Sequence, residues 1–322
     1  MTEGADPLVV VAGPTGTGKS GLSLDLADAF ATRGRTVEIV GADAMQLYRG
    51  MDIGTAKLSL EDRRGVPHHL IDTLDPSETS TVAAYQLAAR AAIADIRSRG
   101  NLPFLVGGSG LYVSSVIQPL DFPGTDPAIR EGLEADLADL GSVGLWTRLR
   151  DQDRAAALAI DAANGRRIVR ALEVIAITGR PYSAVLPEQR NAGEPTRTIV
   201  LDVEPDQRPA LKETLARRVQ QMFADGLIAE VEALTPEALG PTARRAIGYA
   251  QAVAVLEGRQ SLEEAIAETV QLTVRYVRRQ RSWFGRYRDA HRLDAMRSDL
   301  VAAAADVIVC APAADGPQVG IQ

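Results

Sequence analysis

A glycine-rich segment near the start of the chain has the residue types and spacing of a phosphate-binding loop. Residues 13–20 match the pattern G-x-x-x-x-G-K-[S/T] and lie between a predicted strand and a predicted helix, the context that this motif requires. Glycines let the backbone fold around an anion with its amides pointing inward, and the N-terminus of the next helix adds positive potential. The motif is usually interpreted as an ATP site. It predicts that a di- or triphosphate binds, without showing which one.

We call residues 13–20 the phosphate loop. Its members are Gly13, Pro14, Thr15, Gly16, Thr17, Gly18, Lys19 and Ser20. Lys19 supplies a full positive charge, and the Ser20 hydroxyl can hold Mg²⁺ as the metal ligand.

Polar residues also follow two other predicted strands. Asp43 comes after the predicted strand in the stretch 37–42, and Ser109 lies in a glycine-rich segment after the stretch 102–106. Because ligands of parallel sheets bind at the carboxyl ends of the strands, we expect both residues near the phosphate loop. A carboxylate there could accept a proton from a nucleophile. The alternatives are that Asp43 caps a helix or turn and that Ser109 is an ordinary loop hydroxyl.

The strand at 102–106 lacks one feature of ATP-driven machines. Motor and switch NTPases normally carry an acidic residue at a strand end that helps hold Mg²⁺, whereas this strand is followed by glycine and serine. This difference weakens the interpretation as an ATP-driven machine. Small-molecule kinases and other enzymes that use diphosphates remain open.

A basic stretch near the end of the chain could contact RNA. Seven arginines fall within eighteen residues, interleaved with aromatic residues: Arg275, Arg278, Arg279, Arg281, Arg286, Arg288 and Arg292. Arginine contacts phosphate, and both arginine and aromatic planes can stack on unpaired bases. The alternative is a solvated arginine face over core aromatics, and we expect Tyr276 and Trp283 to pack inward. His68 and His69 are adjacent on an extended segment and point to opposite sides, so we expect structural roles rather than metal binding.

The pattern of elements predicts a parallel α/β sheet wrapped by helices. Strands are expected at 8–12, 37–40, 102–106 and 198–203 and helices at 19–32, 82–97, 212–224, 243–256 and 261–288, the last beginning with a capping box of Ser261 and Glu264. Between 126 and 182 the periodicity is helical, with almost no strand signal. We therefore expect a P-loop core of residues 1–120 and 197–322, a helical insertion domain of 121–196, and a loose tail from 311 to 322.

Composition fits a cytoplasmic globular protein. The chain has 322 residues, of which 46% are hydrophobic and 24% charged, and a net charge of −7 that disfavours a generally basic surface but allows a local basic patch. Its single cysteine, Cys310, excludes intramolecular disulfides. No apolar run reaches the roughly 18 residues of a membrane helix, and the N-terminus lacks a signal pattern. We find no extra apolar stripe that calls for a partner, so we expect a monomer.

Several segments together resemble the bacterial tRNA dimethylallyltransferase family, also called tRNA isopentenyltransferases. The similarity is carried by residues 43–57 (DAMQLYRGMDIGTAK), 66–72 (VPHHLID), 106–112 (VGGSGLY), 170–174 (RALEV), 246–249 (AIGY) and 278–284 (RRQRSWF). Their order and spacing fit the family over about residues 8–294.

The resemblance implies a P-loop core with a helical insertion and a through-channel, entered by dimethylallyl diphosphate from one side and a flipped base from the other. The phosphate loop would hold the diphosphate and Mg²⁺, and Arg218 would also reach the diphosphate. Asp43 would be the general base, and Ser109 stands where the family usually has threonine. The expected tRNA contacts, including the two arginines of the basic stretch, are Asp43, Ala44, Met45, Gln46, Ser109, Arg130, Arg166, Arg167, Arg170, Arg278 and Arg279.

We expect transfer of a dimethylallyl group to the exocyclic amine of the adenosine 3′-adjacent to the anticodon, with the anticodon stem-loop of tRNA as partner. One alternative is a prenyltransferase for free adenine nucleotide, which would need neither the insertion nor the basic stretch. A second is an ATP-dependent small-molecule kinase in which Asp43 deprotonates an alcohol. A third, a non-catalytic RNA-binding protein, is disfavoured by the intact Gly18-Lys19-Ser20.

Overall fold

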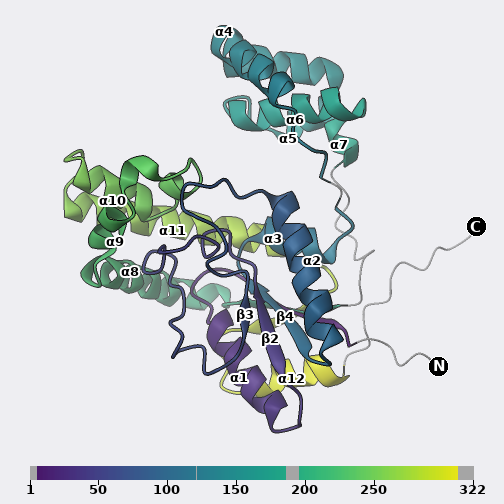
Figure 1. Cartoon of the computed structure of the whole chain (residues 1–322), viewed down its shortest axis with the longest axis vertical. Helices are drawn as coiled ribbons and strands as arrows, with labels where there is room; N and C mark the ends of the chain where they lie inside the picture. The colour runs from purple at the N-terminus through teal and green to yellow at the C-terminus, as the bar shows by residue number, and fades with distance from the viewer. Residues whose placement is uncertain (1–5, 121, 186–195, 311–322) are drawn as a thin grey trace, which may run out of the picture. The chain divides into compact units, whose positions relative to one another are not determined.

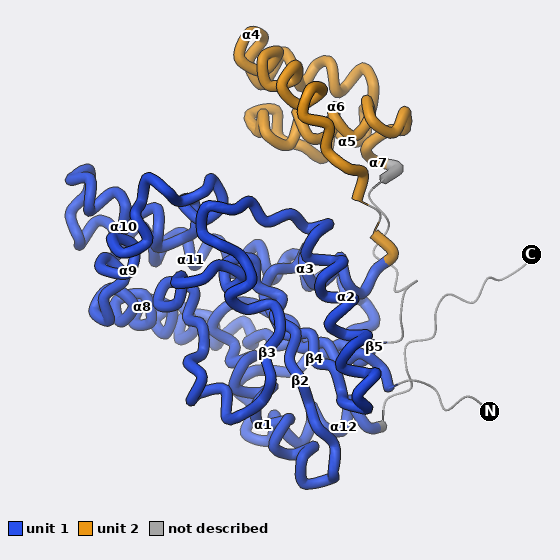
Figure 2. The backbone as a smooth tube through the Cα atoms, in the orientation of Figure 1, with its two compact units in different colours: residues 1–118, 191–322 blue, residues 119–190 orange. Residues whose placement is uncertain are grey.

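The computed structural model describes residues 6–120, 122–185 and 196–310 and divides into two compact units. The core unit comprises residues 1–118 and 191–322, and the insertion unit comprises residues 119–190 (Figure 2). The insertion begins two residues before the expected start at 121, and its expected end at 196 adjoins residues 186–195, which lie outside the described residues.

The core unit is built on a parallel six-stranded sheet. Its strands are β1 (Leu8–Ala12), β2 (Val37–Gly41), β3 (His68–His69), β4 (Leu102–Gly107), β5 (Thr196–Asp202) and β6 (His291–Asp294). The spatial order is β3-β2-β4-β1-β5-β6, so β1 lies in the middle, with Val10 beside Leu105 on one side and Thr198 on the other. Because every pair is parallel, the loops after β1, β2 and β4 meet at one edge.

Helices cover both faces of this sheet, as Figure 1 shows. The helices in contact with the sheet are α1 (Lys19–Ala31), α2 (Val82–Ser98), α3 (Gly110–Ile117) and α12 (Leu300–Cys310). Alternation along β1 explains the two layers: Val10 packs with α2 and α3, whereas Val9 and Val11 pack with α1 and α12. Both faces of β1 are therefore apolar and fully buried, as is usual for a central strand of a parallel sheet.

A second group of helices packs beside the loop that follows β2. It consists of α8 (Arg208–Ala224), α9 (Leu227–Ala233), α10 (Tyr249–Leu256) and α11 (Leu262–Phe284), with short 3₁₀ turns at Pro205–Gln207, Pro236–Ala238 and Ala243–Arg245. Tyr48 and Met51 of the loop are fully buried in the same apolar cluster as Phe223 and Tyr249. These helices thereby fix a loop that starts at the sheet edge.

The insertion unit is entirely helical in its described part, as expected. Its helices are α4 (Pro127–Gln152), α5 (Arg154–Ala159), α6 (Gly165–Thr178) and α7 (Tyr182–Val185). Leu145 and Leu149 of α4 pack on Ile168 and Leu172 of α6 to form a separate core. Gly141 has φ 68° and ψ 170°, which puts a kink in α4.

Most expected elements of the core unit are confirmed, with several corrections. The predicted helix 243–256 is broken, because Gly248 has φ 91° and α10 starts only at Tyr249. The region after residue 203 is not all helical, since β6 adds an edge strand. The last long helix ends at Phe284 rather than 288, and the expected tail from 311 lies outside the described residues. Within the described ranges, no helix is long and apolar enough to cross a membrane.

Candidate active site

The phosphate loop folds back on itself and presents unused backbone amides. Lys19 Nζ donates to the Pro14 carbonyl at 2.7 Å, and Thr17 Oγ1 donates to the same oxygen at 2.9 Å. Gly16 and Gly18 have φ of 88° and 75°, a region that suits glycine. Across the described residues, the N–H groups of positions 16–18 meet no acceptor. Such a set of amides at a helix N-terminus is suited to bind an anion.

The charges around the loop are coupled. Burial lowers the pKa of Lys19 to about 8, while Asp43 raises it and Arg218 lowers it further. Burial also lowers the pKa of Arg218, and Asp43 again opposes that shift. Asp43 is thus the carboxylate that acts on both cations, as expected for a group at the same edge of the sheet. Two cations with one carboxylate leave a positive surplus for an anionic ligand.

Backbone and hydroxyl contacts join the loop after β4 to the loop after β2. The Ser109 N–H donates to the Ala42 carbonyl at 3.2 Å, and the Ala44 N–H donates to Ser109 Oγ at 3.2 Å. Asp43 Oδ1 accepts from the Met45 N–H at 2.9 Å, so Asp43 also closes a turn. Asp43 Oδ2 has no hydrogen-bond partner in the described part of the chain and remains available to a ligand.

Gln280 of α11 joins the phosphate loop to the loop after β4. Its side chain is buried, with Oε1 accepting from the Thr15 N–H and Nε2 donating to the Gly108 carbonyl, both at 2.9 Å. Tyr276 lies one turn earlier, and burial followed by the nearby Asp43 raises its pKa, while Ser109 and Gln280 oppose that shift. One helix thus sets the spacing of the loops that follow β1 and β4.

A cavity of about 290 Å³ opens between these loops and the helices α8, α10 and α11. Polar and charged groups enter it from the sheet edge and from the helices: Thr15, Asp43, Ser109, Arg218, Arg245, Thr273, Tyr276 and Arg279. Apolar side chains line another part: Leu215, Val219, Met222, Ala246 and Ile247. The remaining wall is formed by Ala44, Met45, Gly54, Thr55, Tyr249 and Thr269. The volume suits a small molecule, and the lining suits one with a charged end and an apolar end.

The structure separates the expected RNA-contacting residues of the core unit into two groups. Ala44 and Met45 line the cavity, and Gln46 Nε2 donates to the Thr55 carbonyl at 3.1 Å. Arg278 and Arg279 are exposed, and Arg279 lies 5.7 Å from the centroid of the Tyr276 ring. These residues are accessible to a ligand.

Two other arginines of the basic stretch have internal partners. Arg281 Nε donates to Asp202 Oδ1 at 2.6 Å, which ties α11 to β5. Arg292 Nη2 donates to the Phe284 carbonyl at 2.9 Å. The stretch is therefore a mixture of structural and accessible arginines, and Tyr276 and Trp283 are half-buried, as expected.

The insertion unit also holds two kinds of expected RNA contacts. Arg130 and Arg170 both pair with the fully buried Glu173, and the two guanidinium groups hold the pKa of that carboxyl below its usual value against the opposing effect of burial. Arg166 and Arg167 are exposed on the first turn of α6. Arg130 and Arg170 have clear structural roles, and Arg166 and Arg167 remain open to RNA.

The environment of Ser20 fits a magnesium ion. Ser20 is exposed at the start of α1, and among the described residues its hydroxyl has no hydrogen-bond partner. No cluster of three or more acidic, histidine or cysteine ligands occurs in the described ranges. Mg²⁺ bound mainly by water and phosphate needs only one or two protein oxygens, so a single hydroxyl beside the phosphate loop is sufficient.

Histidines 68 and 69 have the structural roles expected of them. They form β3, where His69 Nε2 lies 2.6 Å from Glu38 Oε2 and His68 Nδ1 lies 2.8 Å from the Val66 carbonyl. Glu38 is buried and also bound by Arg99 and Asn101, so hydrogen bonds outweigh burial and lower its pKa to about 2. This cluster anchors the edge of the sheet and is separate from the cavity.

Sequence reasoning missed several residues of the site. Gln280 and Tyr249 lie in the segments that resemble the family, and the similarity could have drawn attention to them. Arg245 lies one residue before such a segment. Glu230, which accepts hydrogen bonds from the N–H groups of Asp52 and Ile53 near the cavity wall, lies in none of those segments and follows an ordinary helical pattern.

Comparison with known proteins gives a consistent result over nearly the whole chain. A family model described as IPP transferase matches residues 46–287. The tRNA dimethylallyltransferase of Clavibacter sepedonicus is 54% identical over 307 residues, which cover 95% of this chain and 99% of that protein.

Solved structures agree with this match. The full-length tRNA isopentenylpyrophosphate transferase from Bacillus halodurans has 38% identity and a TM-score of 0.66, and the alignment covers 94% of this chain and 97% of that one. A eukaryotic dimethylallyltransferase acting on tRNA has 26% identity and a TM-score of 0.77, with 96% of this chain and 81% of that one covered. The resemblance found in the sequence is confirmed, and this chain belongs to the tRNA dimethylallyltransferase family of prenyl-transferring enzymes.

Proposed function

We propose that this protein transfers a dimethylallyl group from dimethylallyl diphosphate to the exocyclic amine of the adenosine 3′-adjacent to the anticodon in tRNA. The observation that carries the proposal is the cavity in which Asp43, Ser109 and Arg218 surround one small space beside the phosphate loop. Its charged end suits a diphosphate, and the apolar side chains of α8 suit a five-carbon chain.

Asp43 has the position and chemistry of a general base. The exocyclic amine of adenine is a weak nucleophile, because its lone pair is delocalised into the ring. As the N–C bond to the dimethylallyl group forms and the C–O bond to diphosphate breaks, Asp43 Oδ2 takes the proton from the amine nitrogen. The Met45 N–H on Oδ1 and the Ser109–Ala44 contact keep this carboxylate in place.

The phosphate loop and its neighbours stabilise the leaving diphosphate. The unpaired amides of residues 16–18, Lys19 and Arg218 are placed to interact with its growing negative charge. When bound through Ser20, Mg²⁺ would neutralise part of the same charge. Ser20 and the loop amides orient the diphosphate.

The RNA partner we propose is the anticodon stem-loop. The base must leave the loop stack to reach a cavity, as base-modifying enzymes generally require. Arg279, which lines the cavity, its exposed neighbour Arg278, and Arg166 and Arg167 on the insertion unit supply phosphate contacts. The relatives from Clavibacter sepedonicus and the eukaryote are named for activity on tRNA, which supports tRNA as the RNA substrate.

The test mixes purified protein with labelled dimethylallyl diphosphate, Mg²⁺ and one of three acceptors. We expect label in unmodified tRNA, at the adenosine beside the anticodon after nuclease digestion. Label only in free adenine nucleotide would replace the proposal with the nucleotide prenyltransferase. A tRNA in which that adenosine is changed to guanosine is the matched control and should remain unlabelled.

A further inference from the structure

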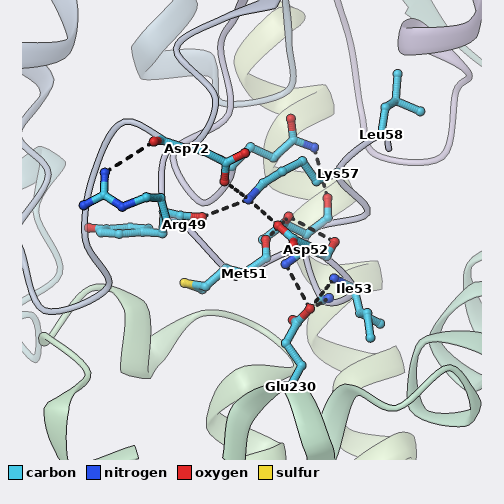
Figure 3. Close-up of polar contacts among 12 residues, drawn as sticks. Arg49, Met51, Asp52, Ile53, Lys57, Leu58, Asp72 and Glu230 are labelled. Atoms are coloured by element: carbon cyan, nitrogen blue, oxygen red, sulfur yellow. Dashed lines mark hydrogen bonds and ion pairs between the residues drawn. The ribbon is translucent and has the colours of Figure 1, made fainter. Parts of the chain in front are cut away.

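The loop that follows Asp43 ends in a segment held by a buried lysine. We call residues 51–57 the rim loop. The side chain of Lys57 is only 3% exposed, and its Nζ donates to the Tyr48 carbonyl at 2.9 Å and to Asp52 Oδ1 and Asp72 Oδ1 at 2.5 Å (Figure 3). The buried Lys57 side chain thus joins the end of the rim loop to its beginning at Asp52. It also joins the loop to Tyr48 and Asp72 on either side of it in the sequence.

Glu230 of α9 binds the other side of the rim loop. Its Oε2 accepts from the N–H groups of Asp52 at 3.0 Å and Ile53 at 2.8 Å (Figure 3), and its Oε1 lies 3.5 Å from the Gly54 nitrogen. Oε1 also accepts from the Tyr249 hydroxyl at 2.5 Å. Four donors converge on one side chain, and a carboxylate, with only acceptor sites, satisfies them.

The rim loop packs closely against the ring of Tyr249. Burial, and then the hydrogen bond to Glu230, raise the pKa of Tyr249, so its hydroxyl stays a donor. A Cβ atom on Gly54 would lie 2.4 Å from Tyr249 Cε2, so the loop lies flat against the ring only with glycine there. Since Tyr249 is fully buried and lines the cavity, the rim loop has little room to shift.

The rim loop connects Glu230 to the substrate cavity. Gly54 and Thr55 line the cavity, whereas Glu230 does not. The Thr55 carbonyl accepts from Gln46 Nε2 at 3.1 Å, and Gln46 lies three residues after Asp43. A displacement of residues 52–55 would therefore move both a wall of the cavity and the side chain of Gln46.

We propose that Glu230 is a positioning residue for the RNA-binding side of the cavity, acting through the rim loop and Gln46, with Lys57 as the second anchor. This inference rests on the proposed function. The phosphate loop is held separately by Gln280 and by its own contacts with Pro14, so loss of Glu230 should leave the diphosphate site intact. Loss of Glu230 should therefore impair the use of tRNA and leave the binding of dimethylallyl diphosphate unchanged.

The experiment measures KM and kcat for both substrates in full-length variants. Glu230→Met removes all four acceptor contacts at similar side-chain length, and we expect kcat/KM for tRNA to fall about ten- to a hundredfold, as for a misplaced reacting group. The KM for dimethylallyl diphosphate should stay within about twofold of wild type. Glu230→Gln should recover most of the loss, because its amide oxygen still accepts from residues 52 and 53 and its NH₂ can donate to the Tyr249 oxygen.

The matched controls are Glu232→Met and Glu232→Gln, an exposed position on the same helix. They should match wild type for both substrates. Equal kinetics for Glu230→Met and Glu232→Met, or an equal rise in both KM values, would overturn the inference. If Glu230→Met does not fold, Glu230→Gln must still have a higher KM for tRNA than Glu232→Gln. A wild-type enzyme that does not prenylate tRNA defeats the proposed function, whereas an active enzyme without this split defeats only the role of Glu230.

Discussion

Gln280 accepts a hydrogen bond from the Thr15 N–H at 2.9 Å, across 265 positions of sequence. The same side chain donates to the Gly108 carbonyl at 2.9 Å. An amide can make both contacts because it carries an acceptor and a donor on one planar group. The phosphate loop and the loop that carries Ser109 are therefore held at a fixed separation by one residue that touches neither a phosphate nor a base in our proposal.

Replacement of Gln280 should weaken the diphosphate site. Gln280→Met removes both contacts, and we expect the KM for dimethylallyl diphosphate to rise about tenfold, the equivalent of roughly 1.4 kcal/mol. Gln280→Glu keeps the acceptor for Thr15 but loses the donor and adds a negative charge near the diphosphate, so its effect should be larger. Gln271→Met, at an exposed position of α11, is the control. Unchanged steady-state KM in both Gln280 variants would contradict this role.

Two substitutions of Asp43 separate its turn contact from its role as a base. Asp43→Ala should lower kcat by roughly 10²–10⁴-fold, the usual range for a general base. Asp43→Asn keeps an oxygen for the Met45 N–H but cannot take a proton, so it should be about as slow. Binding of dimethylallyl diphosphate, measured by calorimetry at neutral pH, should persist in both. An Asn variant with near-normal single-turnover rates would show that Asp43 only shapes the turn.

The lowered pKa of Lys19 predicts a pH dependence of diphosphate affinity. The free site has a Lys19 pKa of about 8, and the anion binds the ammonium form. Affinity should be constant below about pH 8 and fall toward tenfold per pH unit above it, because binding then requires proton uptake. Lys19→Arg should flatten this dependence, since a guanidinium stays charged across the range. Equal slopes for the two proteins between pH 7 and 10 would show that another group titrates.

The accessible arginines of α11 should determine the salt dependence of tRNA binding. Each phosphate contact contributes about 0.7–0.9 to the slope of log affinity against log salt. The double replacement of Arg278 and Arg279 by alanine should therefore weaken tRNA binding and reduce the slope by up to about two. The affinity for dimethylallyl diphosphate should hardly change. Arg33→Ala, at an exposed position two residues after the end of α1, serves as control, and wild-type affinity and slope in the double variant would refute the assignment.

The central strands could be predicted from sequence because their signal is local. β1 and β4 are apolar runs, β2 is a β-branched run interrupted only by Glu38, and all three end in or before glycine; the structure has them within one residue of the expected bounds. The edge strands β3 and β6 have sequences HH and HRLD, which carry no apolar pattern. They are strands because β2 and β5 offer free edges, as in the pairing of Ile199 with His291.

The parts of the site were predictable, but the contacts that assemble it were not. The positions of Asp43 and Ser109 near the phosphate loop could be predicted, because each follows a strand and parallel strands bring their carboxyl ends to one edge of the sheet. Gln280 and Arg281 are neighbours in a basic stretch, yet one bridges two loops and the other pairs with Asp202. Helical periodicity gives the face of a residue but not its partner 79 or 265 positions away. The same limit applies to Glu230, which acts on a loop 176–178 positions earlier.

We expect the phosphate loop to work without ATP. The loop offers amides, Lys19 and the Ser20 hydroxyl, and these groups can bind the end of a prenyl diphosphate as well as the end of a nucleotide. β4 is followed by Gly108 and Ser109, which leaves no strand-end acid of the kind ATP-hydrolysing sites use. Asp43 faces the cavity, where it can serve an incoming amine. ATP could at most occupy the loop as a mimic of the diphosphate.

We therefore expect full prenyl transfer in a reaction that contains protein, tRNA, Mg²⁺ and dimethylallyl diphosphate but no nucleoside triphosphate. Chelation of Mg²⁺ should abolish the reaction and its readdition restore it, because the diphosphate then regains a counter-charge. Lys19→Ala should be severely impaired even with Mg²⁺ present, since the loop loses its only full charge. When ATP is added, phosphate release should not accompany transfer, as a coupled assay can show. A strict requirement for ATP would defeat this prediction and favour a kinase-like reaction at the same loop.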